Sequence, residues 1–298
     1  MGELLSLVSG ILFGSSNVFT RRGVHRAGES FSALPVSITI GIIFIFIALL
    51  TSGGLGGLRH LSWLGMASLG AAGILHFVIG RALNYTSLRL IGANRAQPLI
   101  SFNIVIAIVF GLIFLAETMT FYLAAGILAV FFGVILIGSS AEGFTKGTRL
   151  GKPVLLKGVL CGLAAGLCYG ISPLLIKIGL RELGSPIAGS LVSHLAAGLV
   201  IAIILVNRRY RSPLVNLKKD ALTPMLYGGT ALAVGQVLRY IALGLVPINV
   251  VIPLTTVDTI SVPVLSYFIN RKIEVFSPKV LGGTFAIMAG IYIILLFR

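Results

Sequence analysis

Charged side chains are scarce in this sequence, and acidic ones are the scarcest. Only 10% of the 298 residues are Asp, Glu, Lys or Arg, and eight are acidic, whereas about a quarter of a soluble domain is charged. Hydrophobic residues make up 57% of the chain, and the mean hydropathy is +1.05. These values exclude a water-soluble globular protein, and also a disordered chain, which has few apolar residues. The composition predicts a protein whose solvent is largely lipid.

Reactive groups are few as well. Cys161 and Cys168 lie seven residues apart in an apolar stretch, about 10 Å along a helix, which is too far for a disulfide and offers no metal site. The chain has no H-E-x-x-H motif, and the stretch resembling a phosphate loop, 147–153, has Pro153 where Ser or Thr would hold magnesium. A single intramembrane aspartate cannot form an aspartyl dyad. We therefore expect no enzymatic activity, no metal and no cofactor.

Long uncharged stretches recur along the chain. Ten windows of at least seventeen residues lack Asp, Glu, Lys and Arg: 4–20, 30–58, 60–80, 96–116, 118–141, 158–176, 183–207, 221–238, 240–257 and 280–297. A bilayer core needs about 20 apolar helical residues, and backbone groups in lipid must be paired internally. The sequence therefore predicts an all-α integral membrane protein with ten transmembrane helices. The ninth window is the least regular, because Asp258 interrupts an apolar run that continues to Asn270.

The chain repeats itself at a nearly constant offset. A shift of 156 residues pairs Gly10 with Gly166, and a shift of 157 pairs Glu117 with Glu274. Such self-similarity indicates duplication of one five-helix unit. The expected parts are a first repeat, a polar linker and a second repeat: 1–141, 142–153 and 154–298.

Five helices per unit is an odd number, so the second copy is expected to cross the membrane upside down. Inverted repeats are the plan of many secondary transporters. Small residues at every fourth position let helix backbones approach closely, which predicts tight packing of the first and sixth helices. The glycines expected to provide it are Gly10, Gly14, Gly162, Gly166 and Gly170.

Several short motifs carry a family resemblance. Phe13–Asn17, Ala82–Thr86 and Leu115–Thr118 in the first half, with Tyr240–Leu243 and Lys272–Glu274 in the second, resemble the EamA type of the drug/metabolite transporter superfamily. The resemblance spans 2–298 and makes each half an EamA-like repeat. It implies a secondary transporter that exports small metabolites such as amino acids or amines, through alternating access of a central cavity between the repeats.

Polar residues inside the spans are costly and are functional candidates by default. Asp258 is the only carboxylate in the middle third of any span, so we expect it to bind solute or a coupling proton or ion, with Arg239 as its partner. The alternative for Arg81, Arg95 and Arg239 is that they are flanking residues that reach the membrane interface, and the alternative for His76 and His194 is that they are core residues. The candidate site residues are Asn17, His76, Asn84, Arg95, Gln97, Tyr169, Gln236, Arg239, Tyr240 and Asp258.

Basic residues cluster at helix ends. The loops after helices 1, 3, 5, 7 and 9 hold 18 of the 23 Lys and Arg, and positive-inside bias then places both termini outside, whereas the family resemblance implies cytoplasmic termini. Such flanks fit lipid headgroups rather than nucleic acid. The expected partners are a small-molecule solute and membrane lipid, in a multi-pass protein of the cell membrane; the oligomeric state stays open. A non-transporting scaffold or sensor on the same fold is the alternative function.

Overall fold

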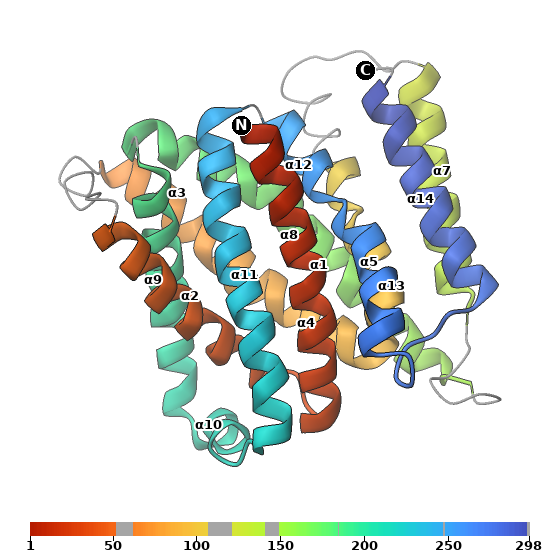
Figure 1. Ribbon diagram of the computed structural model, residues 1–298, viewed down its shortest axis with the longest axis horizontal. Coiled ribbons are helices and arrows are strands. Elements are labelled where there is room, and N and C mark those ends of the chain that lie inside the picture. Colours follow the sequence, from red (N-terminus) through yellow and green to blue (C-terminus); the bar gives the residue numbers. More distant parts are fainter. Residues whose placement is uncertain (52–61, 107–120, 141–148, 184, 247, 297–298) are drawn as a thin grey trace.

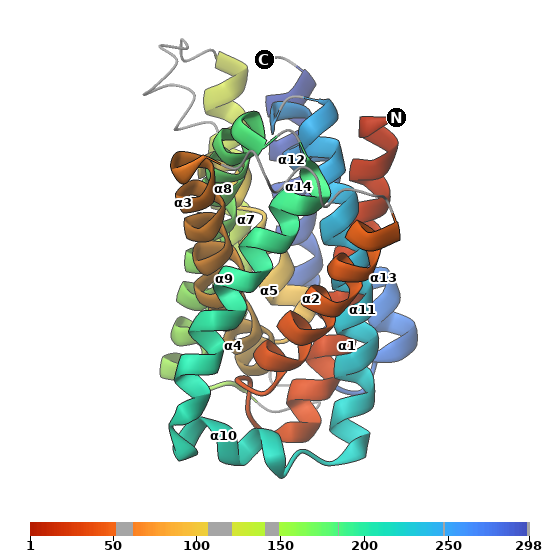
Figure 2. The same ribbon diagram turned by 90° about the vertical axis from the view of Figure 1, so that its left-hand side faces the viewer.

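The computed structural model describes residues 1–51, 62–106, 121–140, 149–183, 185–246 and 248–296, which are built from helices without a β-strand (Figures 1 and 2). The first half contains α1 (Gly2–Ala27), α2 (Ala33–Thr51), α3 (Trp63–Gly73), the π-helix η2 (Ile74–Gly80), α4 (Arg81–Ile91), α5 (Ala93–Ile100) and α7 (Phe121–Gly138). The second half contains α8 (Lys152–Leu183), α9 (Pro186–Val206), α10 (Arg208–Val215), α11 (Lys219–Leu245), α12 (Ile248–Thr255), α13 (Asp258–Ile269) and α14 (Pro278–Leu296).

Within the described residues, six helices are long and apolar enough to cross a membrane. They are α1, α2, the continuous α3–η2–α4 helix, α8, α9 and α11. Shorter apolar helices lie in α7, α13 and α14. The predicted all-helical membrane architecture is therefore confirmed at this level.

Most of the large contacts join one half of the chain to the other. α1 packs along α11, α3–η2–α4 along α8, α2 against α9, α5 against α13, and α7 against α14. The α7–α14 pair stands at one edge of the molecule, while the others form its body (Figure 1). The core is thus the boundary between the two halves.

The structure corrects the boundaries of the predicted ninth helix. Residues 240–245 continue α11, which ends where Val246 adopts an extended conformation (φ −132°, ψ 161°). Val246 precedes Pro247, and proline disfavours a helical conformation in the residue before it. The apolar segment that follows is divided into α12 and α13, with a turn at Thr256 and Val257. The absence of charge shows that a segment is compatible with lipid, but it does not show where a helix begins or ends, which explains the error.

A second interruption lies in the first half. α5 ends at Ile100, and a turn at 101–102 separates it from helical residues 103–106. Each turn comes three residues after a proline, Pro98 in α5 and Pro253 in α12. The two interruptions face each other, because the hydroxyls of Ser101 and Thr259 are hydrogen-bonded at 2.5 Å.

The predicted glycines lie in close contacts, but the two glycine faces do not meet each other. A Cβ on Gly10 would lie 2.5 Å from the Thr255 carbonyl oxygen of α12, and one on Gly166 would lie 2.8 Å from the Ile100 oxygen of α5. Each face therefore receives the interrupted helix of the other half. The remaining three follow the same pattern: Gly14 packs on Ser261, Gly170 on Asn103, and Gly162 on Ser87 and Leu99.

Candidate functional site

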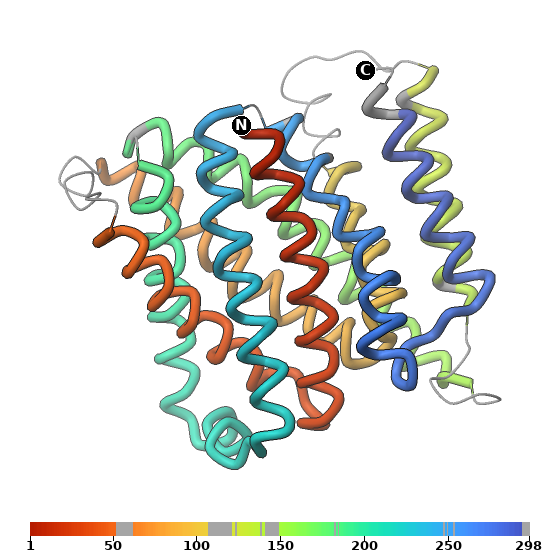
Figure 3. The backbone as a smooth tube through the Cα atoms, in the orientation of Figure 1, coloured from red at the N-terminus to blue at the C-terminus, as the bar shows by residue number. Residues whose placement is uncertain are grey.

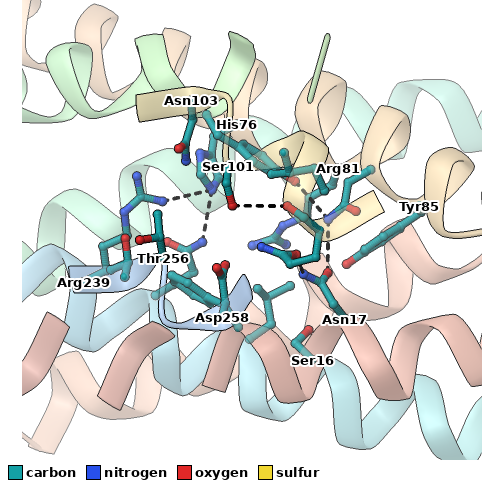
Figure 4. A pocket seen from close by; sticks show the side chains of 18 residues that line it. Ser16, Asn17, His76, Arg81, Tyr85, Ser101, Asn103, Arg239, Thr256 and Asp258 are labelled. Atoms are coloured by element: carbon teal, nitrogen blue, oxygen red, sulfur yellow. Dashed lines mark hydrogen bonds between the residues drawn. The ribbon is translucent and has the colours of Figure 1, made fainter. Parts of the chain in front are cut away.

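A cavity of about 60 Å³ lies at the interruptions in α5 and α12–α13. Side chains from α1, η2, α4, α5, α8, α11, α12 and α13 converge on it (Figure 4). Its volume holds a few water molecules. The lining consists of Phe13, Ser16, Asn17, His76, Arg81, Asn84, Tyr85, Gln97, Ile100, Ser101, Asn103, Tyr169, Leu232, Gln236, Arg239, Thr255, Thr256 and Asp258.

Eight of the ten residues predicted from the sequence line this cavity: Asn17, His76, Asn84, Gln97, Tyr169, Gln236, Arg239 and Asp258. Most of them are buried, and their polar groups have been removed from bulk water. Burying a polar group costs free energy unless a partner compensates it. The structure thus gathers costly groups from seven helical elements into one place.

The other two predicted residues lie elsewhere. Tyr240 is fully buried and does not line the cavity, because it follows Arg239 directly and successive helical residues point about 100° apart. Arg95 is fully buried and donates to the Ser140 hydroxyl at 3.2 Å, toward the end of α7. Two positions separate it from Gln97, so the two side chains leave α5 on nearly opposite faces.

A chain of amide hydrogen bonds crosses one wall of the cavity. Asn84 donates to Asn17 Oδ1 at 3.2 Å, and Asn17 donates to Gln97 Oε1 at 2.5 Å. Gln97 also interacts with the Asp258 carboxylate, to which Thr259 donates its hydroxyl at 3.3 Å. Asp258, at the first position of α13, is therefore connected to α4 and α1 through α5.

His76 organises the opposite wall. Its Nε2 faces Gln236 Nε2 at 3.2 Å and Arg239 Nη1 at 3.5 Å, both of which are donors, so Nε2 is the acceptor. Its Nδ1 lies 2.7 Å from the Ser172 hydroxyl, which assigns the ring proton to Nδ1. A neutral His76 thus holds Gln236 and Arg239 in place, and Figure 4 shows Arg239 pointing toward His76.

Two buried arginines line the cavity without a carboxylate partner. Arg81 and Arg239 are 2% and 6% exposed, and no carboxylate among the described residues forms an ion pair with either. Arg81 lies over the Phe77 ring, 4.5 Å from its centroid, and its Nε and Nη2 have no hydrogen-bond acceptor, like the Nε of Arg239. Asp258 interacts electrostatically with Arg239 but makes no ion pair with it, so the predicted pairing is not formed. Neither arginine reaches the surface, which contradicts the flanking alternative for this pair.

Several lining residues were absent from the predicted set. Arg81, Tyr85 and Asn103 line the cavity, and each has a buried side-chain polar atom without a hydrogen-bond partner among the described residues. Asn103 carried a usable signal, since it is an uncharged polar residue inside an apolar window. Arg81 carried a weaker one, because it ends such a window and is indistinguishable by sequence from a residue at the membrane surface.

A second buried ionic cluster lies at the end of α1. Arg21 and Glu274 form an ion pair at 3.1 Å with side chains 0% and 1% exposed. Arg21 also donates to the carbonyl oxygens of Arg89 and Ile273, each at 3.0 Å. Glu274 in turn accepts from the backbone N–H groups of Ala93 and Asn94 at the start of α5. We call Arg21, Glu274 and these backbone partners the clamp.

The clamp ties together helix ends that meet on one side of the cavity. It joins α1, the end of α4, the start of α5 and the α13–α14 connection. A carboxylate on free N–H groups at a helix start is favourable, because the helix dipole is positive there. Glu117, which the internal repeat pairs with Glu274, lies outside the described residues.

The family assignment agrees with this arrangement. A family model described as the EamA-like transporter family matches residues 1–139 and 156–296, one half of the chain each. The chain belongs to the EamA-like transporter family. Residues 140–155 lie between the two matched segments.

One solved structure shares the overall fold of this EamA-like chain. A protein of known crystal structure superposes with a TM-score of 0.58 at 15% sequence identity, covering 98% of this chain and 94% of that one. No curated protein sequence matched significantly. The family is one of transporters rather than enzymes, and its members are drug/metabolite transporters in the wider classification. The EamA-like chain is therefore a multi-pass integral membrane protein.

Proposed function

We propose that this protein is a secondary transporter that moves a small metabolite through the cavity by alternating access. The observation that carries the proposal is the polar cavity between the halves, at the interruptions in two helices. Transporters bind their solutes at discontinuous helices near the bilayer midplane. Buried polar groups in such number are a cost that a purely structural bundle has no reason to carry.

The proposed topology is ten helices in two inverted repeats, 1–141 and 154–298, joined by the linker 142–153. In the repeat, α1 corresponds to α8, and α3–η2–α4 corresponds to α11. The contact of α1 with α11 therefore corresponds to the contact of α8 with α3–η2–α4, and both are present. In Figure 3, α1 runs downward from the N-terminus, whereas α8 runs upward. Lys177, which the repeat aligns with Arg21, donates to the carbonyl oxygens of Leu243 and Val246 as Arg21 donates to that of Arg89.

Alternating access requires that one side of the cavity open while the other closes. The clamp joins three helix ends on the side where α1 terminates, so in this conformation that side is held shut. Opening there requires the contacts of Arg21 and Glu274 to separate. We expect export, across the cell membrane, as the physiological direction.

Asp258 is proposed as the carboxylate that couples transport to a gradient. It lines the cavity at the break between α12 and α13, and no ion pair is formed by it within the described part of the chain. A carboxylate in such a site either finds a cation or takes up a proton. Exchange of that proton or cation during the cycle would link solute movement to the gradient.

Counterflow in proteoliposomes tests the proposal. Purified protein is reconstituted with an internal pool of amino acids, sugars, nucleosides or amines, and entry of the labelled compound is followed. We expect accumulation of at least one class, dependent on the internal pool and absent from protein-free liposomes. Equal entry into both kinds of liposome for every class would contradict transport and favour the scaffold or sensor.

A further inference from the structure

The cavity carries more positive charge than its own residues balance. Arg81 and Arg239 stay protonated, since arginine does not lose its proton in proteins. Asp258 is the one carboxylate among the cavity's lining residues. Whether or not Asp258 holds a proton, at least one positive charge in the cavity lacks a fixed counter-charge.

The free donors of these arginines point to what is missing. Arg81 has Nε and Nη2 free, and Arg239 has Nε free, although both side chains are more than nine-tenths buried. A buried charge without a partner costs several kcal/mol. The planar guanidinium group presents parallel N–H donors that match a carboxylate or phosphate. We propose that the transported solute is a small carboxylic acid whose carboxylate is bound by Arg81 and Arg239.

The charge balance favours a carboxylate over a phosphate ester. With Asp258 ionised, a solute with one net negative charge, such as a hydroxy acid, neutralises the cavity, whereas a phosphate monoester brings about −1.5 to −2 and exceeds the charge to be balanced. His76 supports the assignment, because it accepts from Arg239 and leaves the Nε of that arginine available.

Free acceptors in the cavity indicate further groups on the solute. The side-chain oxygens Asn84 Oδ1, Asn103 Oδ1 and Gln236 Oε1 have no hydrogen-bond partner. They suit N–H or O–H donors, and Asp258 suits an ammonium group. An amino acid or a hydroxy acid offers a carboxylate to the arginines and N–H or O–H donors to the free oxygens, and only the hydroxy acid also neutralises the cavity. An amine without a carboxylate leaves the arginines unpaired.

The inference rests on the proposed function in taking the cavity as the solute site, but it is tested by binding alone. The full-length protein, purified in detergent, is heated with matched pairs of compounds that differ by one carboxylate: L-serine and ethanolamine, L-alanine and ethylamine, L-lactate and ethanol. Inorganic phosphate is a separate arm. We expect at least one acid to raise the unfolding midpoint, and its decarboxylated partner and phosphate to leave it unchanged.

Variants locate the binding. Arg81→Gln and Arg239→Gln should weaken binding of that acid about tenfold to a hundredfold, as for loss of a hydrogen bond to a charged group. Arg239→Lys keeps the charge and should retain part of the affinity. Arg209→Gln is the control, because Arg209 is exposed on α10 and its loss should change nothing.

Three results would overturn the inference: no acid shifts the midpoint, the decarboxylated partner or phosphate shifts it equally, or both glutamine variants bind as wild type does. Its failure is distinguishable from that of the proposed function. Counterflow of amines without acids would refute the carboxylate and leave transport standing. Acid binding without counterflow of any compound would refute transport and leave the carboxylate site standing.

Discussion

Two clusters of buried charge lie along the boundary between the halves, and they are built differently. In the clamp, Arg21 has an ion-pair partner on Nε and carbonyl acceptors on both terminal nitrogens. In the cavity, Arg81 and Arg239 retain donors without acceptors. Burial is nearly complete in both places. Burial alone therefore does not separate structure from function, and the state of the partners does.

The two clusters differ in where the partners of their charged groups come from. The clamp is complete within the protein, and its removal exposes an uncompensated charge. The cavity is incomplete, and a molecule from outside supplies what it lacks. The predictions below test that contrast, beginning with the largest expected effect.

Breaking the clamp should cause the largest loss of stability. Arg21→Gln leaves Glu274 buried and unpaired, and Glu274→Gln does the same to Arg21; removing one partner of a buried pair costs about 3–5 kcal/mol. Thermal unfolding of the purified variants in detergent measures the loss. The double variant should lose less than the two single losses combined, since neither charge is then left behind. Unchanged midpoints in both single variants would show that the clamp is not a structural pair.

Filling the glycine contacts should cost less. Gly10→Ala places a Cβ 2.5 Å from the Thr255 carbonyl oxygen, and Gly166→Ala places one 2.8 Å from that of Ile100. Backbone atoms cannot rotate away, so the interrupted helices must shift, at a cost of about 1–3 kcal/mol. Gly70→Ala is the matched control, because the nearest atom to its added Cβ, on Ala196, is 3.7 Å away. Equal behaviour of all three alanine variants in thermal unfolding would refute the close contact.

Removing a cavity arginine should have the smallest effect on stability. Arg239→Gln without solute relieves an unpaired buried charge, so its unfolding midpoint should equal or exceed that of the wild type. The same measurement on Arg21→Gln gives the contrast directly. A destabilisation of Arg239→Gln as large as that of Arg21→Gln would erase the distinction between the two clusters.

Much of this architecture was accessible from the sequence. Helices follow from apolar length, and the gathering of Asn17, His76 and Asp258 follows from the cost of polar groups in lipid. Helix ends were less accessible, because the proline that terminates α11 is itself uncharged and lies inside an apolar window.

Side-chain direction and partners could not be read from the sequence. Arg239 and Tyr240 are neighbours, yet only one of them lines the cavity. Arg21 and Arg81 are similar as arginines beside apolar windows, and only the fold brings Glu274 to Arg21 and leaves Arg81 without a carboxylate. Such pairings depend on contacts between residues far apart in the chain.

The orientation of the protein in the membrane is a further prediction, and testing it requires no measurement of stability. Exposed basic residues gather on α10 and its flanks, at the end opposite the start of α1 (Figure 1). The positive-inside rule places that end in the cytoplasm and both termini outside. Single cysteines introduced between Arg208 and Lys219 should resist an impermeant reagent on whole cells and react after lysis. Ready labelling of intact cells would show the reverse orientation.

The central claim, that the cavity works in transport, is tested most directly by solute flux through Asp258→Asn in proteoliposomes. The substitution keeps size and hydrogen bonding and removes the charge. Insertion and abundance should match the wild type, while accumulation driven by an imposed proton gradient should be lost. Accumulation at the wild-type rate, with an unchanged dependence on pH, would contradict the account and make Asp258 a structural residue.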